Sequence, residues 1–133
     1  MMKIEVVVED QNGIKQNCHI DISKSESWNL FFWGIKIQIE IEASDLFIAS
    51  TVLREHLEQR NCKLLCNASR RNIFVSTMSR EMGGGRKGYI VQIGQPASRD
   101  TLVDIFGYVD SSLVVSIEEQ QLFHEKWIES LRG

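Results

Sequence analysis

The residues best suited to bind a charged ligand are concentrated in one segment, residues 61–88. A glycine run in this segment is followed by two cations, in the order Gly83, Gly84, Gly85, Arg86 and Lys87. Glycine-rich loops let backbone N–H groups approach an anion, and an arginine matches a phosphate or a carboxylate with two parallel hydrogen bonds. We therefore predict a site for an anion or an acidic partner. Its candidate residues are Arg70, Arg71, Arg80, Gly83, Gly84, Gly85, Arg86 and Lys87.

The glycine spacing alone does not identify a nucleotide site. Gly83-x-Gly85-x-x-Gly88 matches the dinucleotide-binding spacing, but that motif follows a strand and opens a helix, whereas here a strand is predicted after it. The Gly-Lys-Ser/Thr ending of a Walker A loop is absent, and so are the further motifs of a protein kinase. A small enzyme or a nucleotide- or phosphate-binding domain that uses the loop from Gly83 to Lys87 remains the alternative hypothesis.

The charge distribution singles out the same segment. The chain has 133 residues and a net charge of −3. Residues 1–60 hold six basic and ten acidic residues, residues 61–88 hold six and one, and residues 89–133 hold three and seven. The middle segment thus carries +5 between two segments of −4. These cations either form a binding surface or pair with the surplus acids elsewhere in the chain, and both interpretations stay open. The overall acidity makes nucleic-acid binding the less favoured role.

The remaining nucleophiles and metal-binding residue types form no recognisable constellation. Cys66 next to a basic turn could be a nucleophile, but a buried reduced thiol is the more common state of such a strand cysteine. The set Cys18, Cys62 and Cys66 is odd in number, lacks zinc spacing and fits a reducing, cytoplasmic compartment. Neighbouring Glu118 and Glu119 do not face each other on a helix. We predict no catalytic residue, no metal site and no cofactor.

Two blocks within the basic segment resemble a known group of sequences. They are Cys66-Asn67-Ala68-Ser69-Arg70-Arg71 and Met78-Ser79-Arg80-Glu81-Met82-Gly83-Gly84-Gly85-Arg86-Lys87-Gly88-Tyr89. Together they resemble a block found in a family of small uncharacterised bacterial proteins, over about a fifth of the chain. The resemblance implies a bacterial origin. It implies no reaction and transfers no catalytic residue.

The elements that must position these residues begin with an antiparallel hairpin. Residues 3–9 and 14–22 flank Gln11-Asn12-Gly13. A three-residue loop with Gly13 in a left-handed conformation places Ile4 opposite Ile20 and Val6 opposite Cys18, so that apolar residues share one face. Isoleucines alternating with polar residues over 35–42 predict a strand with one exposed face. A helix follows to about residue 60, capped by Ser44 or Asp45, with an apolar stripe of Leu46, Ala49, Val52, Leu53, His56 and Leu57.

The sequence of the second half of the chain predicts shorter strands and helices. Strands are expected at 63–66, 73–75 and 89–93, with a turn at 67–72 and a short helical turn at 77–82. Ser98 is expected to cap a helix running to about residue 106. Ser116 and Glu119 form a capping box for a final helix, whose predicted apolar side carries Phe123, Trp127, Ile128 and Leu131. The sum is an α+β fold, mainly an antiparallel sheet with two principal helices, in a single domain spanning residues 1–133.

Four aromatic residues within six positions offer another binding feature. Trp28, Phe31, Phe32 and Trp33 are more than one face of one strand can bury, so at least one is expected to be partly exposed. Aromatic residues dominate protein interfaces, although most of these four are expected to pack in the core.

The sequence therefore predicts a small soluble bacterial interaction protein, possessing no membrane span, that binds an acidic protein partner or a phosphorylated small molecule through its basic segment. An immunity or accessory role would suit its size. The oligomeric state is not predicted.

Overall fold

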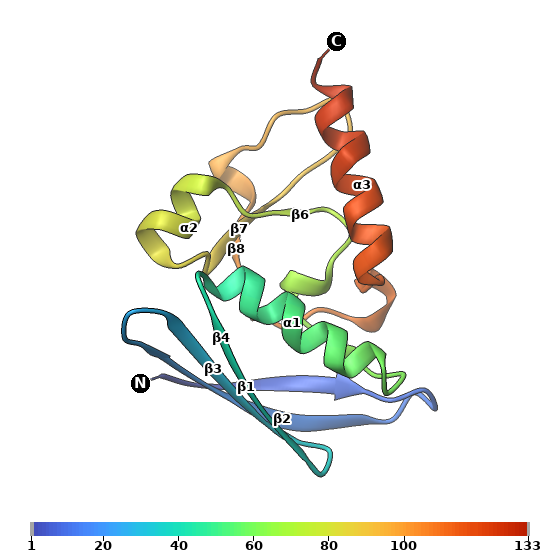
Figure 1. Cartoon of the computed structure of the whole chain (residues 1–133). Coiled ribbons are helices and arrows are strands. Elements are labelled where there is room, and N and C mark those ends of the chain that lie inside the picture. Colours follow the sequence, from blue (N-terminus) through green and yellow to red (C-terminus); the bar gives the residue numbers. More distant parts are fainter. Residues whose placement is uncertain (1, 133) are drawn as a thin grey trace.

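A computed structural model describes residues 2–132 (Figure 1). It begins with the predicted hairpin, formed by β1 (Met2–Glu9) and β2 (Lys15–Lys24). The register is confirmed, since Ile4 pairs with Ile20 and Val6 with Cys18. Gly13 closes the loop with a φ of 79°, and the Asp10 side chain accepts the N–H groups of Asn12 and Ile14. The loop is thus held by the conformation that glycine adopts at least cost.

Three further strands complete a five-stranded antiparallel sheet in the order β4-β3-β2-β1-β5. They are β3 (Trp28–Gly34), β4 (Ile37–Ala43) and the short β5 (Lys63–Leu64). The alternation predicted for 35–42 is confirmed, but the strand starts at Ile37 because Ile35 and Lys36 form a turn with φ values of 45° and 65°. β5 returns from a distant part of the chain to pair with β1.

The helix α1 (Leu46–Glu58) covers the inner face of this sheet and begins at Asp45, whose side chain accepts the N–H of Ile48. Leu46, Ala49, Leu53 and Leu57 are buried against the sheet, whose inner residues include Ile20 and Phe32. Each fully buried leucine stabilises the fold by about 1.5–3 kcal/mol.

One position of the predicted α1 stripe is wrong. His56 is exposed, and Arg54 is buried in its place. Arg54 lies eight residues after Leu46, on the face that points inward.

A smaller antiparallel sheet has the order β6-β7-β8, formed by β6 (Ile73–Phe74), β7 (Lys87–Ile90) and β8 (Leu102–Asp104). The helix α2 (Thr77–Gly83) connects β6 to β7. Residues 67–72 do not join two paired strands as predicted. They lead from the first sheet to the second and include a 3₁₀ turn at Asn67–Ser69.

The helix predicted from Ser98 to about residue 106 is also wrong. Ser98 caps only a 3₁₀ turn, Arg99–Thr101, after which the chain extends into β8 and pairs with β7. Another 3₁₀ turn, Ser111–Leu113, precedes the last helix.

The last helix, α3 (Ile117–Ser130), starts at Ser116 as its capping box predicts. Trp127 is buried as expected, whereas Leu131 is exposed and lies beyond the helix. The expected α+β class is confirmed: α1 and α3 are the two principal helices, and α2 has seven residues.

Figure 1 shows all three helices on the same side of the five-stranded sheet, with the other face of the sheet uncovered by any part of the described chain. Over residues 2–132, no helix is long and apolar enough to cross a membrane.

Candidate anion- and partner-binding surfaces

The glycine run is a site of close packing between α2 and the start of α1. Gly84 ends α2 in the left-handed conformation, with a φ of 68°, and its carbonyl accepts the N–H of Leu46 at 2.6 Å. A Cβ at Gly84 would collide with the indole of Trp28, and one at Gly85 would crowd Asp45 and Phe47. These two glycines allow the loop to approach both neighbours closely.

The amide groups of this loop are directed into the protein. The N–H groups of Gly84 and Gly85 donate to the Ser79 carbonyl, and that of Arg86 donates to Gly83 at 3.3 Å. A phosphate cradle requires several convergent N–H groups without other acceptors. Three consecutive amides of the loop therefore serve the fold in this conformation.

Arg80 holds α2 against the start of α1. Its Nη1 lies 3.2 Å from Asp45 Oδ2, its Nε donates to the Val75 carbonyl, and its guanidinium lies 5.1 Å from the centre of the Phe47 ring. Because Asp45 also caps α1, one carboxylate links both helices. Arg80 borders a groove of about 550 Å³ between α2 and α3, which also contains Glu125 and His124.

Arg86 forms the most regular ion pair of the basic segment. Its Nε and Nη2 donate to the two carboxylate oxygens of Asp104 at 2.8 and 2.9 Å. Burial alone would raise the pKa of Asp104, but hydrogen bonds from Arg86 and the Phe106 N–H, together with the charges of Arg86 and Lys87, outweigh it and lower that pKa. This pair links the residue before β7 to the last residue of β8.

Arg70 and Arg71 lie elsewhere and line a groove of about 400 Å³. It is formed by the residues before β6, those after β7, the segment before α3, and α3 itself. Arg71 pairs with Glu119 at 3.2 Å, and both side chains are more than half exposed. Arg70 Nε makes a long contact, 3.4 Å, to the Asn72 side chain, and its guanidinium has no ion pair with any described carboxylate.

The same groove exposes apolar surface. Ile93 is 52% exposed and Leu113 is 44% exposed. None of the described residues lining this groove is acidic; they are Arg70, Arg71, Asn72, Val91, Gln92, Ile93, Ser112, Leu113, Val115 and Phe123. We call this surface the Arg70–Arg71 groove. It brings together two of the eight sequence candidates. Arg80, Gly84, Gly85 and Arg86 pack elsewhere, and Gly83 and Lys87 are exposed.

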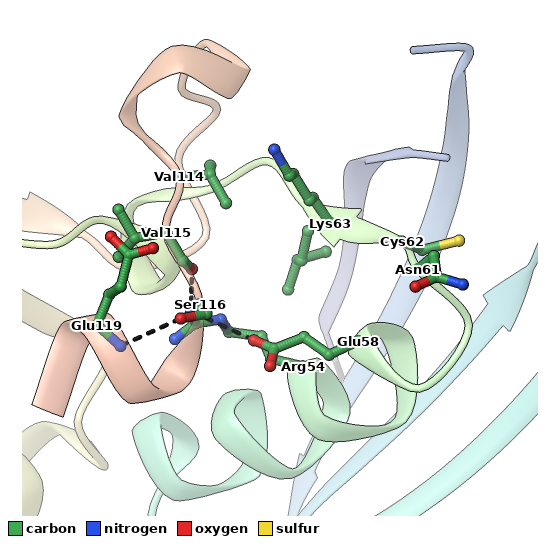
Figure 2. Close-up of a pocket in the computed structure, with 10 residues that line it drawn as sticks. Arg54, Glu58, Asn61, Cys62, Lys63, Val114, Val115, Ser116 and Glu119 are labelled. Carbon is green, nitrogen blue, oxygen red and sulfur yellow. Dashed lines mark hydrogen bonds and ion pairs between the residues drawn. The ribbon is translucent and has the colours of Figure 1, made fainter. Parts of the chain in front are cut away.

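A cavity of about 440 Å³ at the start of α3 contains a cation that the sequence analysis did not select (Figure 2). Arg54 is 3% exposed and donates to the carbonyls of Ala68 and Val115 and to Gln120 Oε1, at 3.1, 2.8 and 2.9 Å. Figure 2 shows Glu58 beside Ser116, and Glu58 accepts the N–H of Ile117 at 3.0 Å. The helix terminus is therefore already capped by carboxylate and hydroxyl groups of the chain itself.

Cys18, Cys62 and Cys66 are free and buried, as predicted. Burial raises the pKa of Cys66 to about 11, against smaller opposing contributions from its hydrogen bonds and Arg54. Because the thiolate is the reactive form, such a thiol is a weak nucleophile at neutral pH. Over residues 2–132, no cluster of three or more His, Cys, Asp or Glu side chains has a geometry suited to a metal ion.

Comparison with known proteins finds no matching family model and no significant match among curated proteins. The resemblance of the Cys66–Arg71 and Met78–Tyr89 blocks to small bacterial proteins stays a hypothesis.

Proposed function

We propose that this protein is a small binding protein that recognises an acidic segment of a partner protein in the Arg70–Arg71 groove. The observation that carries the proposal is the pairing of two arginines with exposed apolar side chains in one groove without a lining acid. Arginine is among the residue types most enriched at the energetically dominant positions of protein interfaces, and the exposed apolar surface beside it can be covered by a partner. A role of the immunity or accessory kind is compatible with such binding.

The charges of the groove are available to a partner at small cost. The exposed Arg71–Glu119 pair is of the kind that contributes about 0–1 kcal/mol, so a partner carboxylate can replace Glu119. Arg70 keeps its terminal nitrogens free of ion pairs with the described residues, so it can bind a carboxylate through two hydrogen bonds. Ile93 and Leu113 would then cover apolar side chains of the same segment.

The alternative, a phosphate or nucleotide bound by the loop from Gly83 to Lys87, draws no support from the loop geometry. Its amides donate within the chain, and Arg86 is engaged by Asp104. We therefore develop only the first proposal.

The test is a titration of ¹⁵N-labelled protein with a blocked peptide of alternating glutamate and leucine. We expect amide shifts at the groove, and up to about tenfold weaker binding by the Arg70→Gln/Arg71→Gln variant, since exposed charge contacts are each worth about 0.2–1 kcal/mol and two are removed. The matched control is Lys15→Gln/Lys126→Gln, which removes two exposed cations outside the groove and outside the predicted site. Equal weakening in both variants would show that only net charge matters and would contradict the proposal.

A further inference from the structure

The outer face of the five-stranded sheet is a second surface with a defined side-chain order. Because paired residues share a face, the register places Lys3, Asp21, Phe31 and Glu40 in one row across β1 to β4. The row on one side of it holds Glu5, His19, Trp33 and Gln38, and the row on its other side holds Ser23, Asn29 and Glu42. No helix of the described chain covers this face (Figure 1).

The carboxylates of this face form no ion pair with the part of the chain that the structure describes. Within residues 2–132, Glu5, Asp21, Glu40 and Glu42 form no ion pair. Lys3 is opposite Asp21 in the register, yet its Nζ lies over the Trp33 ring, 5.8 Å from the ring centre. Among the residues named in these rows, one lysine therefore faces four carboxylates, and none of the four is held in an ion pair by a described residue.

Aromatic rings lie between these carboxylates. Phe31 and Trp33 are partly exposed, with ring centres 5.5 Å apart, and His19 stacks on Trp33 at 5.2 Å. Phe31 stands between Asp21 and Glu40 in its row, so an aromatic ring is flanked on both sides by carboxylates. An arginine or lysine side chain is attracted by both kinds of group, by the carboxylates through charge and by the ring through a cation–π contact.

A hollow of about 590 Å³ lies at this position. None of its described lining residues is basic; they are Asp21, Ser23, Asn29, Leu30, Phe31, Glu40, Ile41 and Glu42. Asp21 Oδ1 is buried and has no hydrogen-bond partner. A buried carboxylate oxygen without a donor costs free energy. An incoming cationic donor would remove that cost once the groups covering this atom move aside, whereas Glu40 is exposed and directly accessible.

We propose that this outer face binds a basic segment of a partner protein by seating an arginine or lysine side chain between Asp21 and Glu40, over the ring of Phe31. The carboxylates and the aromatic rings together favour a cationic side chain, because it can form an ion pair with the former and a cation–π contact with the latter. The proposal does not depend on the Arg70–Arg71 groove, which involves different residues and the opposite charge.

The experiment titrates ¹⁵N-labelled protein with the blocked pentapeptide Gly-Arg-Ser-Arg-Gly and, as a neutral probe, Gly-Gln-Ser-Gln-Gly. We expect the arginine peptide to shift amides of β2, β3 and β4 and the ring protons of Phe31, while the neutral peptide does not. The variant Asp21→Asn/Glu40→Gln should weaken binding of the arginine peptide about tenfold, as expected for removal of two contacting charges. Phe31→Leu, which keeps an apolar side chain, should weaken it about threefold.

The matched control is Glu55→Gln/Glu125→Gln, which removes two exposed carboxylates from α1 and α3. It should change the affinity for the arginine peptide less than twofold, within the small effect of remote exposed charges. Equal weakening by the control and the sheet variant, or shifts centred on α3, would overturn the proposal. So would concentration-dependent self-association that Asp21→Asn/Glu40→Gln abolishes, because the occupant would then be a second copy of this chain.

Discussion

The basic segment, residues 61–88, and the outer face of the five-stranded sheet use their charges in opposite ways. In the basic segment, Arg71, Arg80 and Arg86 each pair with a carboxylate from another part of the chain. On the sheet face, acids such as Asp21 and Glu40 lack an ion pair with any described residue. Charge density along a sequence therefore shows where charges are, while the fold decides which of them remain free for a partner.

Arg54 is the extreme case of a cation used internally. We expect Arg54→Leu to lower the free energy of unfolding by about 3–5 kcal/mol, because the carbonyls of Ala68 and Val115 would lose a buried charged donor. Urea denaturation gives the value. Arg60→Gln, at an exposed cation just beyond the same helix, should cost less than about 0.5 kcal/mol. A loss for Arg54→Leu as small as that would contradict the structural role of this cation.

Arg86 should show an intermediate effect. Arg86→Gln removes a partly buried ion pair with two hydrogen bonds, and we expect it to cost about 1–2 kcal/mol. A double-mutant cycle with Asp104→Asn isolates the interaction between the two side chains. A coupling energy indistinguishable from zero would mean that Arg86 is free for a ligand. It would contradict the internal role of this arginine and would favour a phosphate site.

The same pair should make stability depend on pH in the acid range. The folded state lowers the pKa of Asp104, so the stabilisation is present above the pKa of the unfolded state and is lost as pH falls through the lower, folded value. The stability difference between the wild-type protein and Arg86→Gln should therefore be full at pH 6 and shrink below about pH 4. Urea denaturation at a series of pH values measures it, and a difference that stays constant down to pH 2 would exclude the pair as its source.

Arg71→Gln should have a smaller effect on stability, below about 0.5 kcal/mol, because both side chains of its ion pair are more than half exposed. The measurement is the shift of the urea midpoint. A cost above about 1 kcal/mol would show that Arg71 is a structural cation like Arg86 and would weaken its assignment to a partner groove.

The smallest effect is expected on the sheet face. Asp21→Asn/Glu40→Gln should change stability by less than about 0.5 kcal/mol, or raise it slightly, since it removes two like charges flanking Phe31 and no ion pair. Thermal unfolding at low salt is the most sensitive readout. A clear loss would show that these carboxylates support the fold and are not held free for a partner.

The parts of the fold that depend on neighbouring residues were predictable from the sequence. The hairpin register follows from matching faces across one short loop, and Asp45 and Ser116 cap helices through contacts within three residues. Ser98 is a cap, as predicted, but a cap does not determine how far a helix extends. Pairing of β8 with β7 ends it after one turn.

The candidate site was less predictable because ion pairing is a long-range property. Arg86 and Asp104 are 18 residues apart, and Arg80 and Asp45 are 35 apart, so no local pattern indicates that they meet. The spacing of Arg54 from Leu46 places it on the buried face of α1, but charged residues are usually exposed, so the sequence did not indicate its burial. Phe31 and Trp33 confirm the expectation that some aromatics of residues 28–33 are partly exposed.

The buried thiols have a kinetic consequence. Cys66 has no exposed surface, and its backbone pairs with that of Tyr108 at a junction between the segment after β5 and the segment after β8. An alkylating reagent reaches this sulfur only when the junction opens, so the labelling rate of Cys66 is set by how often that opening occurs. Followed by mass spectrometry, the thiol becomes an intrinsic reporter of transient separation in the native protein. A partner that binds the closed state would slow its labelling.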